Sequence, residues 1–243
     1  MFLKRIKTGV RDHGILIYGV YVFKRMIDVL SKKILIQFVF LFVLPVDKNR
    51  IKIPLFIRKK YDVQVLRRYH KMLDGFPVSR KTMDFRFSQD ALCFVLLKDQ
   101  NPIGFLWLIL GRYEEDIVYC DLVMDHEIAW DFDLWIHDHF RLSPAFSLLW
   151  QSAFEYLDGL GVKYIFSRIS TLNNNSVGVH TRLGGCIVGK LFFIQYRGFE
   201  ICMDSVLGKL SLHTRKKRKT IRLRSVIGSK SLGNMCKNRE VKG

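Results

Sequence analysis

The residues of this sequence best suited to chemistry are three carboxylates on one predicted strand. Glu127, Asp131 and Asp133 alternate with apolar residues between Ile128 and Ile136, a period-two pattern that predicts a strand with one acidic face. Two carboxylates on one face repel each other, which raises the pKa of one towards a value suited to accepting a proton. The alternative is that these acids are solvated at the open end of the strand, as most surface carboxylates are.

Arg141 and the residues that follow it form a second candidate, for binding phosphate. Ser143 suits a helix N-cap and Pro144 suits the first helical position, and an apolar stripe at helical spacing continues to Leu157. The free backbone N–H groups at such a helix start, together with the helix dipole, attract an anion. The alternative is that Arg141 pairs with a neighbouring carboxylate while Ser143 only caps the helix.

Periodicity and turn signals predict the elements that must position these residues. Strands are expected at residues 34–46, 51–57, 91–97, 102–110, 127–137, 163–170, 186–195 and 199–203. Helices are expected at residues 15–30, 61–73, 79–88, 144–157 and 176–183. Hairpin turns are expected at residues 98–101 and 196–198. This alternation of strands and helices predicts a mixed α/β fold.

The positive charge of the chain is concentrated at its two ends. Of 243 residues, 49% are apolar, which excludes a disordered or collagen-like chain, and the formal net charge is +18. Residues 1–33 carry 8 basic and 2 acidic side chains, and residues 209–243 carry 12 basic and 1 acidic. We therefore expect a basic amphipathic N-terminal helix in residues 1–33, one domain in residues 34–208, and a disordered basic tail in residues 209–243.

The apolar runs near the N-terminus are too short to cross a membrane. The run 14–23 has ten residues and the run 34–46 has thirteen, whereas a spanning helix needs about 20. Neither run ends in a signal-peptide cleavage site. Two interpretations of the helix at residues 15–30 stay open: it packs on its own domain, or it lies on an anionic membrane surface.

The cysteines favour a reducing compartment. There are five of them, an odd number, with no C-x-x-C pair, and most lie within apolar runs. We therefore expect reduced thiols in a cytoplasmic protein, with a peripheral place on the inner face of the membrane as a further expectation. His and Cys residues do not cluster at zinc-binding spacings, so no metal is expected.

Taken together, residues 130–184 resemble the Gcn5-related N-acetyltransferase (GNAT) superfamily. The motifs that carry the resemblance are the strand 129–136, the Arg-led loop 141–146, the helix 144–157, the strand 164–170, Asn173, and the helix 176–183 before Gly184. Members found in cell-surface polysaccharide gene clusters look most similar. The resemblance implies a GNAT-like mixed central sheet flanked by helices, here with an apolar, basic helix before it and a basic tail after it.

The resemblance also implies transfer of an acyl group from acetyl-CoA, or another acyl-CoA, to a primary amine such as an amino sugar. In that scheme the central strand splays from its neighbour and its free backbone pairs with the pantetheine arm, while the loop and helix start hold the diphosphate. The residues that it assigns to acyl-CoA are Leu134, Trp135, Ile136, Arg141, Ala145, Phe146, Ser147 and Asn173. Pro144 and Phe146 replace glycines of the usual loop, so we expect the position of the Phe146 ring to decide how a diphosphate fits.

Two kinds of catalytic group follow from the same resemblance. A carboxylate accepts the proton of the incoming ammonium, with Asp131 and Asp133 preferred over Glu127. His180 lies seven residues after Asn173, where the superfamily commonly has a tyrosine that protonates the leaving thiolate, and an imidazole can donate a proton near neutral pH. The alternative for His180 is a hydrogen-bonded structural residue.

Functions of other classes stay open at this point. The basic ends could bind nucleic acid or an anionic membrane through their charge, although no zinc finger, RNA-recognition signature or clear helix-turn-helix accompanies them. A non-catalytic domain of the same fold is a third reading. Trp107, Trp130 and Trp135 could stack on a sugar, but tryptophans in apolar strands usually fill the core.

Overall fold

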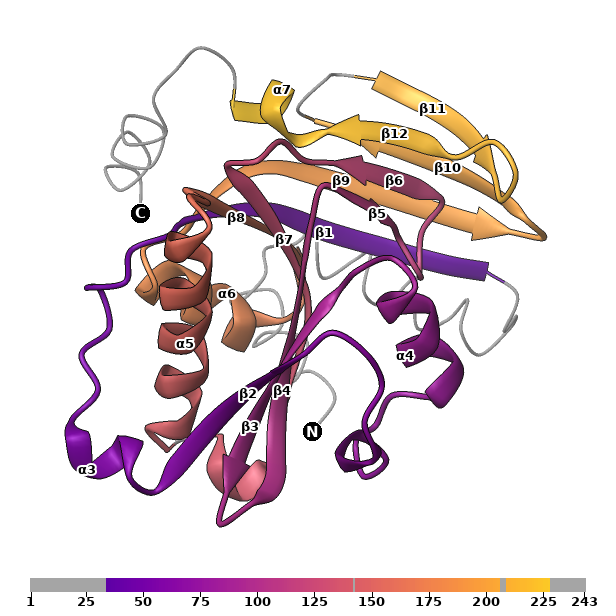
Figure 1. Ribbon diagram of the computed structural model, residues 1–243. Helices are drawn as coiled ribbons and strands as arrows, with labels where there is room; N and C mark the ends of the chain where they lie inside the picture. The colour runs from indigo at the N-terminus through magenta and orange to yellow at the C-terminus, as the bar shows by residue number, and fades with distance from the viewer. Residues whose placement is uncertain (1–33, 142, 206–208, 228–243) are drawn as a thin grey trace, which may run out of the picture.

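The computed structural model describes residues 34–141, 143–205 and 209–227, and one nine-stranded sheet runs through this part of the chain (Figure 1). The strand order of this large sheet is β11-β10-β9-β1-β8-β7-β4-β3-β2. Its strands are β1 (Ile34–Pro45), β2 (Tyr61–Leu66), β3 (Leu92–Lys98), β4 (Asn101–Leu110), β7 (Ile128–Ile136), β8 (Tyr164–Ser170), β9 (Cys186–Tyr196), β10 (Phe199–Asp204) and β11 (Lys209–Thr214).

A small sheet and a few helices complete the described chain. The small sheet, in the order β12-β6-β5, contains β5 (Arg112–Glu114), β6 (Cys120–Val123) and β12 (Lys219–Arg222). The helices are α3 (Leu55–Arg58), α4 (Arg80–Phe87), α5 (Ala145–Gly159), α6 (Asn174–Arg182) and α7 (Leu223–Ile227), with 3-10 turns η1 (Lys71–Leu73) and η2 (Asp138–Phe140). The mixed α/β fold is thus as expected.

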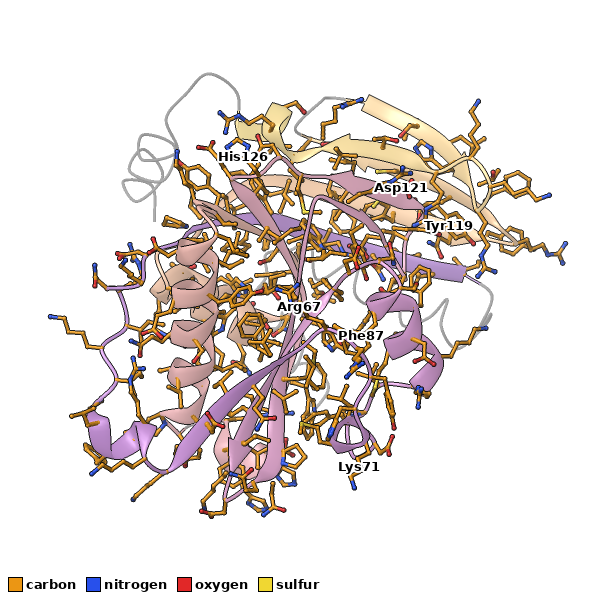
Figure 2. All side chains as sticks on the ribbon, viewed as in Figure 1. Arg67, Lys71, Phe87, Tyr119, Asp121 and His126 are labelled. Carbon is orange, nitrogen blue, oxygen red and sulfur yellow. The ribbon has the colours of Figure 1, made fainter. Side chains whose placement is uncertain are left out.

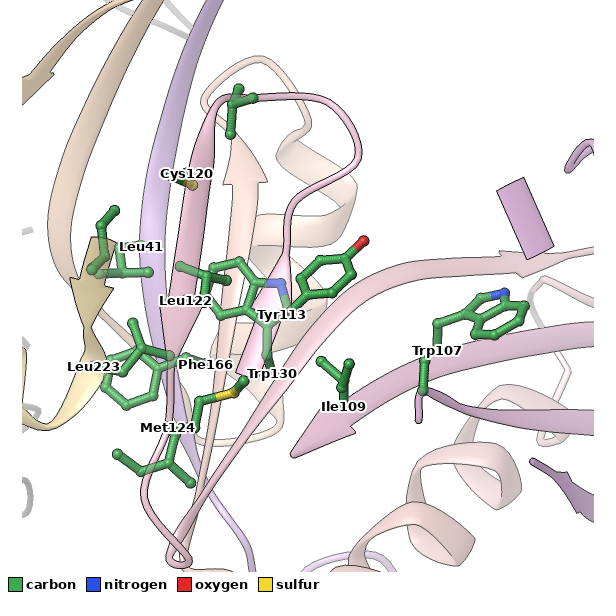
Figure 3. Packing of buried hydrophobic residues seen from close by; sticks show 14 of the residues in the cluster. Leu41, Trp107, Ile109, Tyr113, Cys120, Leu122, Met124, Trp130, Phe166 and Leu223 are labelled. Carbon is green, nitrogen blue, oxygen red and sulfur yellow. The ribbon is translucent and has the colours of Figure 1, made fainter. Parts of the chain in front are cut away.

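Both faces of the central strands of the large sheet are covered by apolar packing. On one face, α5 packs Leu149, Trp150 and Phe154 against side chains of β3 and β4. On the other face, the small sheet packs Tyr113 and Leu122 against the strands, as Figure 3 shows. Burial of both faces explains why the central strands read as nearly continuous apolar runs.

Most predicted elements are confirmed, and local signals explain why. Ser79 caps α4 by accepting a hydrogen bond from the Thr82 amide at 3.1 Å. The β3–β4 hairpin turns at Asp99 and Gln100, both of which have positive φ angles. Figure 2 shows the side chains on these elements, with Phe87 at the end of α4.

Two predictions between residues 51 and 73 are wrong. The segment 51–57 is not a strand, because α3 begins directly after Pro54, whose fixed φ angle suits a helix start. The segment 61–73 is not a helix, because Tyr61–Leu66 forms the strand β2, which pairs antiparallel with β3. Tyr61, Val63 and Val65 alternate as in a strand, although the apolar residues of this segment also fit helical spacing. The segment forms a strand because β3 offers an edge with which it can pair.

The expectation of a disordered tail from residue 209 is wrong for residues 209–227. Strand β11 pairs with β10, and β12 pairs in parallel with β6. The Arg218 guanidinium donates to Asp121 at 2.6 Å and to three backbone carbonyls, those of Glu115, Val118 and Cys120. A cation with this many acceptors is structural, so a basic run here does not indicate a solvated tail.

Other expectations fall partly or wholly outside the described residues. The N-terminal helix expected in residues 1–33 lies outside them, as does the tail beyond residue 227. Within the described residues no helix is both long and apolar enough to cross a bilayer. Cys93, Cys120 and Cys202 are buried free thiols, whereas Cys186 is disulfide-bonded, so the expectation of reduced thiols is wrong for Cys186.

Gly104 on β4 provides a test of the close approach between β4 and β7. A Cβ atom at residue 104 would lie 2.8 Å from Cγ1 of Ile136 and 2.9 Å from the carbonyl oxygen of Trp135. Because the backbone oxygen cannot move without disturbing the strand pair, we expect Gly104→Ala to lower the free energy of unfolding by about 1 to 3 kcal/mol. Urea unfolding measures this loss.

The matched control for this substitution is Gly75→Ala. A Cβ atom at residue 75 would meet nothing within 4 Å, so its effect should stay within about 0.5 kcal/mol. Equal effects at the two glycines would show that β4 and β7 do not approach as closely as described.

Candidate active site

The candidate site lies where two parallel strands separate. β7 and β8 pair at four positions, from Ile128 opposite Tyr164 to Asp131 opposite Ser167. Beyond Asp131, β7 continues along β4 and β8 continues along β1. Residues 132–136 of β7 therefore have no strand partner on the β8 side among the described residues, which leaves one backbone edge open.

A β-bulge accompanies the separation and overturns the predicted acidic face. In the pairing of β4 with β7, Trp107 lies opposite Asp133 and Leu108 lies opposite Asp131, so Phe132 is an extra residue. Because the alternation skips one position there, Asp131 and Asp133 contact opposite faces of the sheet. Asp131 contacts α6, whereas Asp133 contacts α4.

Glu127 also departs from the predicted set. It precedes β7, at the end of the strand away from the open edge, and its carboxylate pairs with Lys163 and Arg224. The hydrogen bonds from these two side chains lower the pKa of Glu127. The prediction that Glu127, Asp131 and Asp133 share one face is therefore wrong, and Glu127 stands apart from the site.

Asp131 forms a buried cluster with Ser167 and His180 at the point where the strands part. The Ser167 hydroxyl donates to Oδ2 of Asp131 at 2.9 Å, and Nε2 of His180 lies 3.1 Å from the same oxygen. Nδ1 of His180 lies 2.8 Å from the carbonyl oxygen of Ser176, one turn earlier in α6. Both partners of the ring are oxygen acceptors, and this geometry favours the form of His180 in which both ring nitrogens carry protons, which is the cation.

The surroundings of His180 act on its pKa in opposite directions. Burial lowers the pKa, but the hydrogen bond and charge of Asp131, and the bond to Ser176, raise it, and the net shift is upward. The ring also lies 5.5 Å from Trp150, edge to face, and 5.8 Å from Phe42. An imidazolium held by a carboxylate and by aromatic rings is a fixed charge.

Asp133 forms a second cluster on the other face, with Arg86 and Asp116. Arg86 donates to Oδ2 of Asp133 at 2.7 Å and to Asp116 at 2.9 Å. The pKa of Asp133 is raised, because the effect of burial and of the nearby carboxylates exceeds the lowering effect of Arg86. The Asp133 side chain is 30% exposed, so it remains accessible to solvent or to a ligand.

Arg141 is hydrogen-bonded to the last residue of the open edge of β7. Its Nε donates to the carbonyl oxygen of Ile136 at 3.1 Å, and its guanidinium pairs with Asp138 at 2.9 Å. The alternative in which Arg141 pairs with a neighbouring carboxylate is therefore what the structure shows. The Arg141 side chain is 58% exposed, so the guanidinium still has free donors beside the helix start.

The first turn of α5 leaves amides available for an anion. The Ser143 hydroxyl donates to the Phe140 carbonyl at 2.7 Å and accepts from the Ala145 amide at 3.3 Å, so that amide is already used. Among the described residues no acceptor takes the amides of Phe146 and Ser147. The Phe146 ring is half-buried and packs against the core beneath α5.

Some of the remaining predicted residues have structural roles, and others lie beside the open edge. The Asn173 side chain caps α6 by accepting from the Ser176 amide at 3.1 Å. Trp107 and Trp130 are buried in the core, as the packing interpretation expects. Trp135 stacks against Phe105 beside the open edge, where Leu134 and Ile136 supply the neighbouring backbone.

Sequence reasoning did not identify Ser167, Arg86 or Asp116 as members of the site. Ser167 lies in the strand that pairs with β7, so its partner became visible only with the register. Arg86 and Asp116 are separated from Asp133 by 47 and 17 positions, and no spacing rule joins them. The described residues contain no group of His, Cys, Asp and Glu that could hold a metal ion.

No family model and no curated protein matches this chain. The similar solved structures include acetyltransferases of the GNAT superfamily. A tandem GNAT protein from the clavulanic acid biosynthesis pathway is 12% identical with a TM-score of 0.45, and the match covers 63% of this chain and 50% of that one. The chain thus spans half the length of that tandem protein.

Two further neighbours are similar to part of the chain. An aminoglycoside acetyltransferase from an uncultured soil metagenomic sample is 12% identical with a TM-score of 0.37, over 52% of this chain and 89% of that one. A GNAT-like protein from Streptococcus suis is 9% identical with a TM-score of 0.42, over 72% and 67%. At these TM-scores the likenesses establish no family.

The charge on His180 predicts a pH dependence of stability. Because the folded pKa lies above the unfolded value of about 6.5, the stabilisation is complete below that pH and is lost as pH rises through the folded pKa. We expect the stability difference between the wild type and His180→Gln, measured by urea unfolding, to shrink as pH increases from about 5.5 to about 8.5.

The control is His126→Gln, at an exposed position that Figure 2 shows in the loop before β7. Its difference from the wild type should stay constant over the same range. A difference that is also constant for His180→Gln would contradict the charged pair with Asp131.

Proposed function

We propose that this protein is an acyl-CoA-dependent N-acyltransferase that acts on a small primary amine. The observation that carries the proposal is the separation of β7 from β8 after Asp131, which leaves an open backbone edge next to the start of α5. A linear ligand with amide groups can pair with such an edge, and its diphosphate can bind the helix start. The pantetheine arm and diphosphate of CoA have this chemistry.

The residues present fit acyl-CoA. The backbone of Leu134, Trp135 and Ile136 would hold the pantetheine arm, and the Phe146 and Ser147 amides with Arg141 would hold the diphosphate. Pro144 has no N–H to donate, but the Phe146 and Ser147 amides that follow it have no acceptor among the described residues. The Phe146 ring packs against the core, so its bulk does not require a glycine at this position. Asn173 would act indirectly, by holding α6 in place.

Asp133 is the residue that we assign as general base. Among the three predicted carboxylates it combines a raised pKa, partial exposure and a position on the open segment of β7. Asp116 adds a second carboxylate beside it, and together they attract an ammonium group. The Asp133 carboxylate accepts the proton that the amine loses before it attacks, and Arg86 holds that carboxylate in place.

Asp131 and His180 have different roles in this proposal. Asp131 is buried and bonded to Ser167 and His180, so it holds His180 and does not act as the base. Bound acyl-CoA would supply an acyl group as a thioester, whose C–S bond breaks as the C–N bond forms, and the departing thiolate takes the second proton that the amine nitrogen loses. The positive charge of His180 stabilises that leaving group, and both of its N–H groups already have acceptors, which favours a fixed charge over a proton donor.

The acceptor class is the finer part of the proposal. Asp133 lies two residues before the half-buried Trp135 on β7, and a carboxylate and an indole ring suit an amine attached to an apolar or sugar-like ring. An amino sugar combines both features, and we propose it as the acceptor, as in polysaccharide biosynthesis. This chemistry needs no nucleic acid and no metal ion.

Asp133→Asn tests the assignment of the base. We expect it to lower kcat/KM for CoA release, in the presence of acetyl-CoA and a panel of amino sugars, by roughly 100-fold. In the wild type, kcat/KM should rise with pH through the raised pKa of Asp133 and then level off, because only the carboxylate accepts a proton. The pH profile of the variant should lack that rise.

Glu127→Gln is the matched control, since Glu127 directly precedes the same strand but pairs with Lys163 and Arg224. Its rates should equal those of the wild type. Thermal melting shows whether both variants fold. Equal rates for the two variants would remove Asp133 from the mechanism.

Ser147→Pro tests the diphosphate site at the start of α5. Proline is tolerated in the first turn of a helix but lacks the N–H group. We expect acetyl-CoA at about 100 times its Kd to stabilise the wild type by about 2.7 kcal/mol in a thermal-shift measurement. The shift should be largely lost in Ser147→Pro.

Ser147→Ala is the control, because it removes the hydroxyl and keeps the amide. It should show the same shift as the wild type. A full shift in Ser147→Pro would place the diphosphate elsewhere, and no shift of the wild type with any acyl-CoA or with CoA would refute the proposed function.

A further inference from the structure

The outer strands of the large sheet expose an apolar face that no described element covers. Its members alternate along two paired strands: Phe199, Ile201 and Met203 on β10, and Leu210 and Leu212 on β11. Their exposed fractions are 56%, 41%, 50%, 72% and 65% respectively. The register sets Ile201 opposite Leu212 and Met203 opposite Leu210, so all five lie on one face, which we call the outer apolar face.

The opposite face of the same strands already serves the core. Glu200, Cys202 and Asp204 alternate with the exposed residues and are buried on the side of the small sheet. Glu200 accepts from the Tyr119 amide at 2.9 Å, and Lys219 of β12 lies 3.4 Å from Asp204. The outer apolar face is therefore not needed for the core, and five large apolar side chains gathered in this way are typical of a binding surface.

Four cations stand at one end of the outer apolar face. Arg197 occupies the two-residue turn between β9 and β10, where its φ angle is positive. Because Phe199 pairs with Thr214, the turn after β11, which carries Arg215, Lys216 and Lys217, lies at the same end. All four side chains are exposed, and among the described residues no carboxylate pairs with them.

Aromatic side chains flank the Arg197 turn. Tyr196, which is 43% exposed, precedes it, and Phe199 follows it. The Arg197 guanidinium lies 5.2 Å from the centre of the Tyr196 ring. Aromatic rings with a polar or charged neighbour are favoured at the boundary between lipid headgroups and acyl chains.

We propose that the outer apolar face and the four cations beside it dock this protein on an anionic lipid surface. The apolar side chains enter the interfacial layer of the membrane, and the cations contact lipid phosphates. This docking site is formed by folded strands, so it differs from the predicted contact through residues 1–33 and the tail. It also does not depend on the proposed transferase activity.

The charge of the chain favours lipid over a second copy as the occupant. Strand β11 is an edge strand, so its backbone could pair with an identical strand. However, a second copy carries the same formal net charge of +18 and the same unpaired cations. These cations repel an identical chain, whereas they are complementary to anionic headgroups.

Vesicle sedimentation with the full chain tests this proposal. We expect binding to vesicles of phosphatidylcholine with phosphatidylglycerol, and little binding to phosphatidylcholine alone. The apolar variant carries Phe199→Thr, Leu210→Thr and Leu212→Thr, since threonine keeps strand propensity at exposed positions. The charge variant carries Arg197→Gln, Lys216→Gln and Lys217→Gln. Each should weaken binding to anionic vesicles at least tenfold.

Matched controls come from exposed residues in and around α3. Leu55→Thr with Phe56→Thr removes apolar side chains that are 76% and 61% exposed. Lys52→Gln, Lys59→Gln and Lys60→Gln remove the same charge as the charge variant. These controls should bind vesicles like the wild type, because they leave the outer apolar face and the four cations beside it intact.

Three outcomes would overturn the proposal. The first is a wild type that does not bind anionic vesicles. The second is an equal loss of binding in the variants and their controls, which would show that total charge alone governs it. The third is a dimer, detected by light scattering, that the apolar variant dissociates without weakening vesicle binding, because a second copy would then cover the outer apolar face.

Discussion

The site depends on the inability of β7 to stay paired with both of its neighbours. It is held to β4 by a register that contains the extra residue Phe132, and a bulge bends a strand and increases its twist. The pairing with β8 ends at the neighbouring residue, Asp131. One irregular position therefore separates the strands, opens a backbone edge and turns Asp133 towards the face opposite that of Asp131.

The two aspartates consequently experience different environments, although only one residue separates them. Asp131 shares a buried cluster with a cationic histidine and a serine hydroxyl, which ties β7, β8 and α6 together. Asp133 shares a half-open cluster with Arg86 and a second carboxylate. Carboxylates with different surroundings can take different parts in one reaction, one as a base and one as the support of a fixed charge. Burying these charges costs free energy, which the ion pairs and hydrogen bonds offset.

Local signals predicted most of the fold. Ser79, Asn173 and the turn at Arg197 and Gly198 each specify their structure through hydrogen bonds or backbone angles within a few residues, and these predictions are confirmed. The strand β2 was predicted as a helix, because its apolar side chains fit the spacing of a helix as well as that of a strand. It is a strand because it pairs with the edge of β3, which lies about 30 positions later in the sequence. The order in residues 209–227 depends on partners about 100 positions earlier, such as Asp121 for Arg218, which composition does not reveal.

In the site, too, the sequence indicates individual residues, whereas the contacts between them depend on how distant segments pack. His180 and Asp131 were predicted as candidates from residue type, position and the resemblance, but their direct contact depends on how α6 packs against β7. The prediction of a shared acidic face is wrong, because side chains alternate strictly between the two faces of a strand only where the strand has no bulge. Arg86 carries no sequence signal, since its two carboxylate partners come from separate segments that the sheet brings together.

The parallel pairing of β12 with β6 also bears on the order of folding. Strand β6 ends at residue 123 and β12 begins at residue 219, so this pair joins segments separated by most of a domain. Pairings over such distances carry a large loop-closure entropy and form late. During synthesis the ribosome must deliver residues 219–222 before β12 can complete the small sheet. Until then, the edge of β6 that pairs with β12 has no strand partner and is open to pairing with other chains.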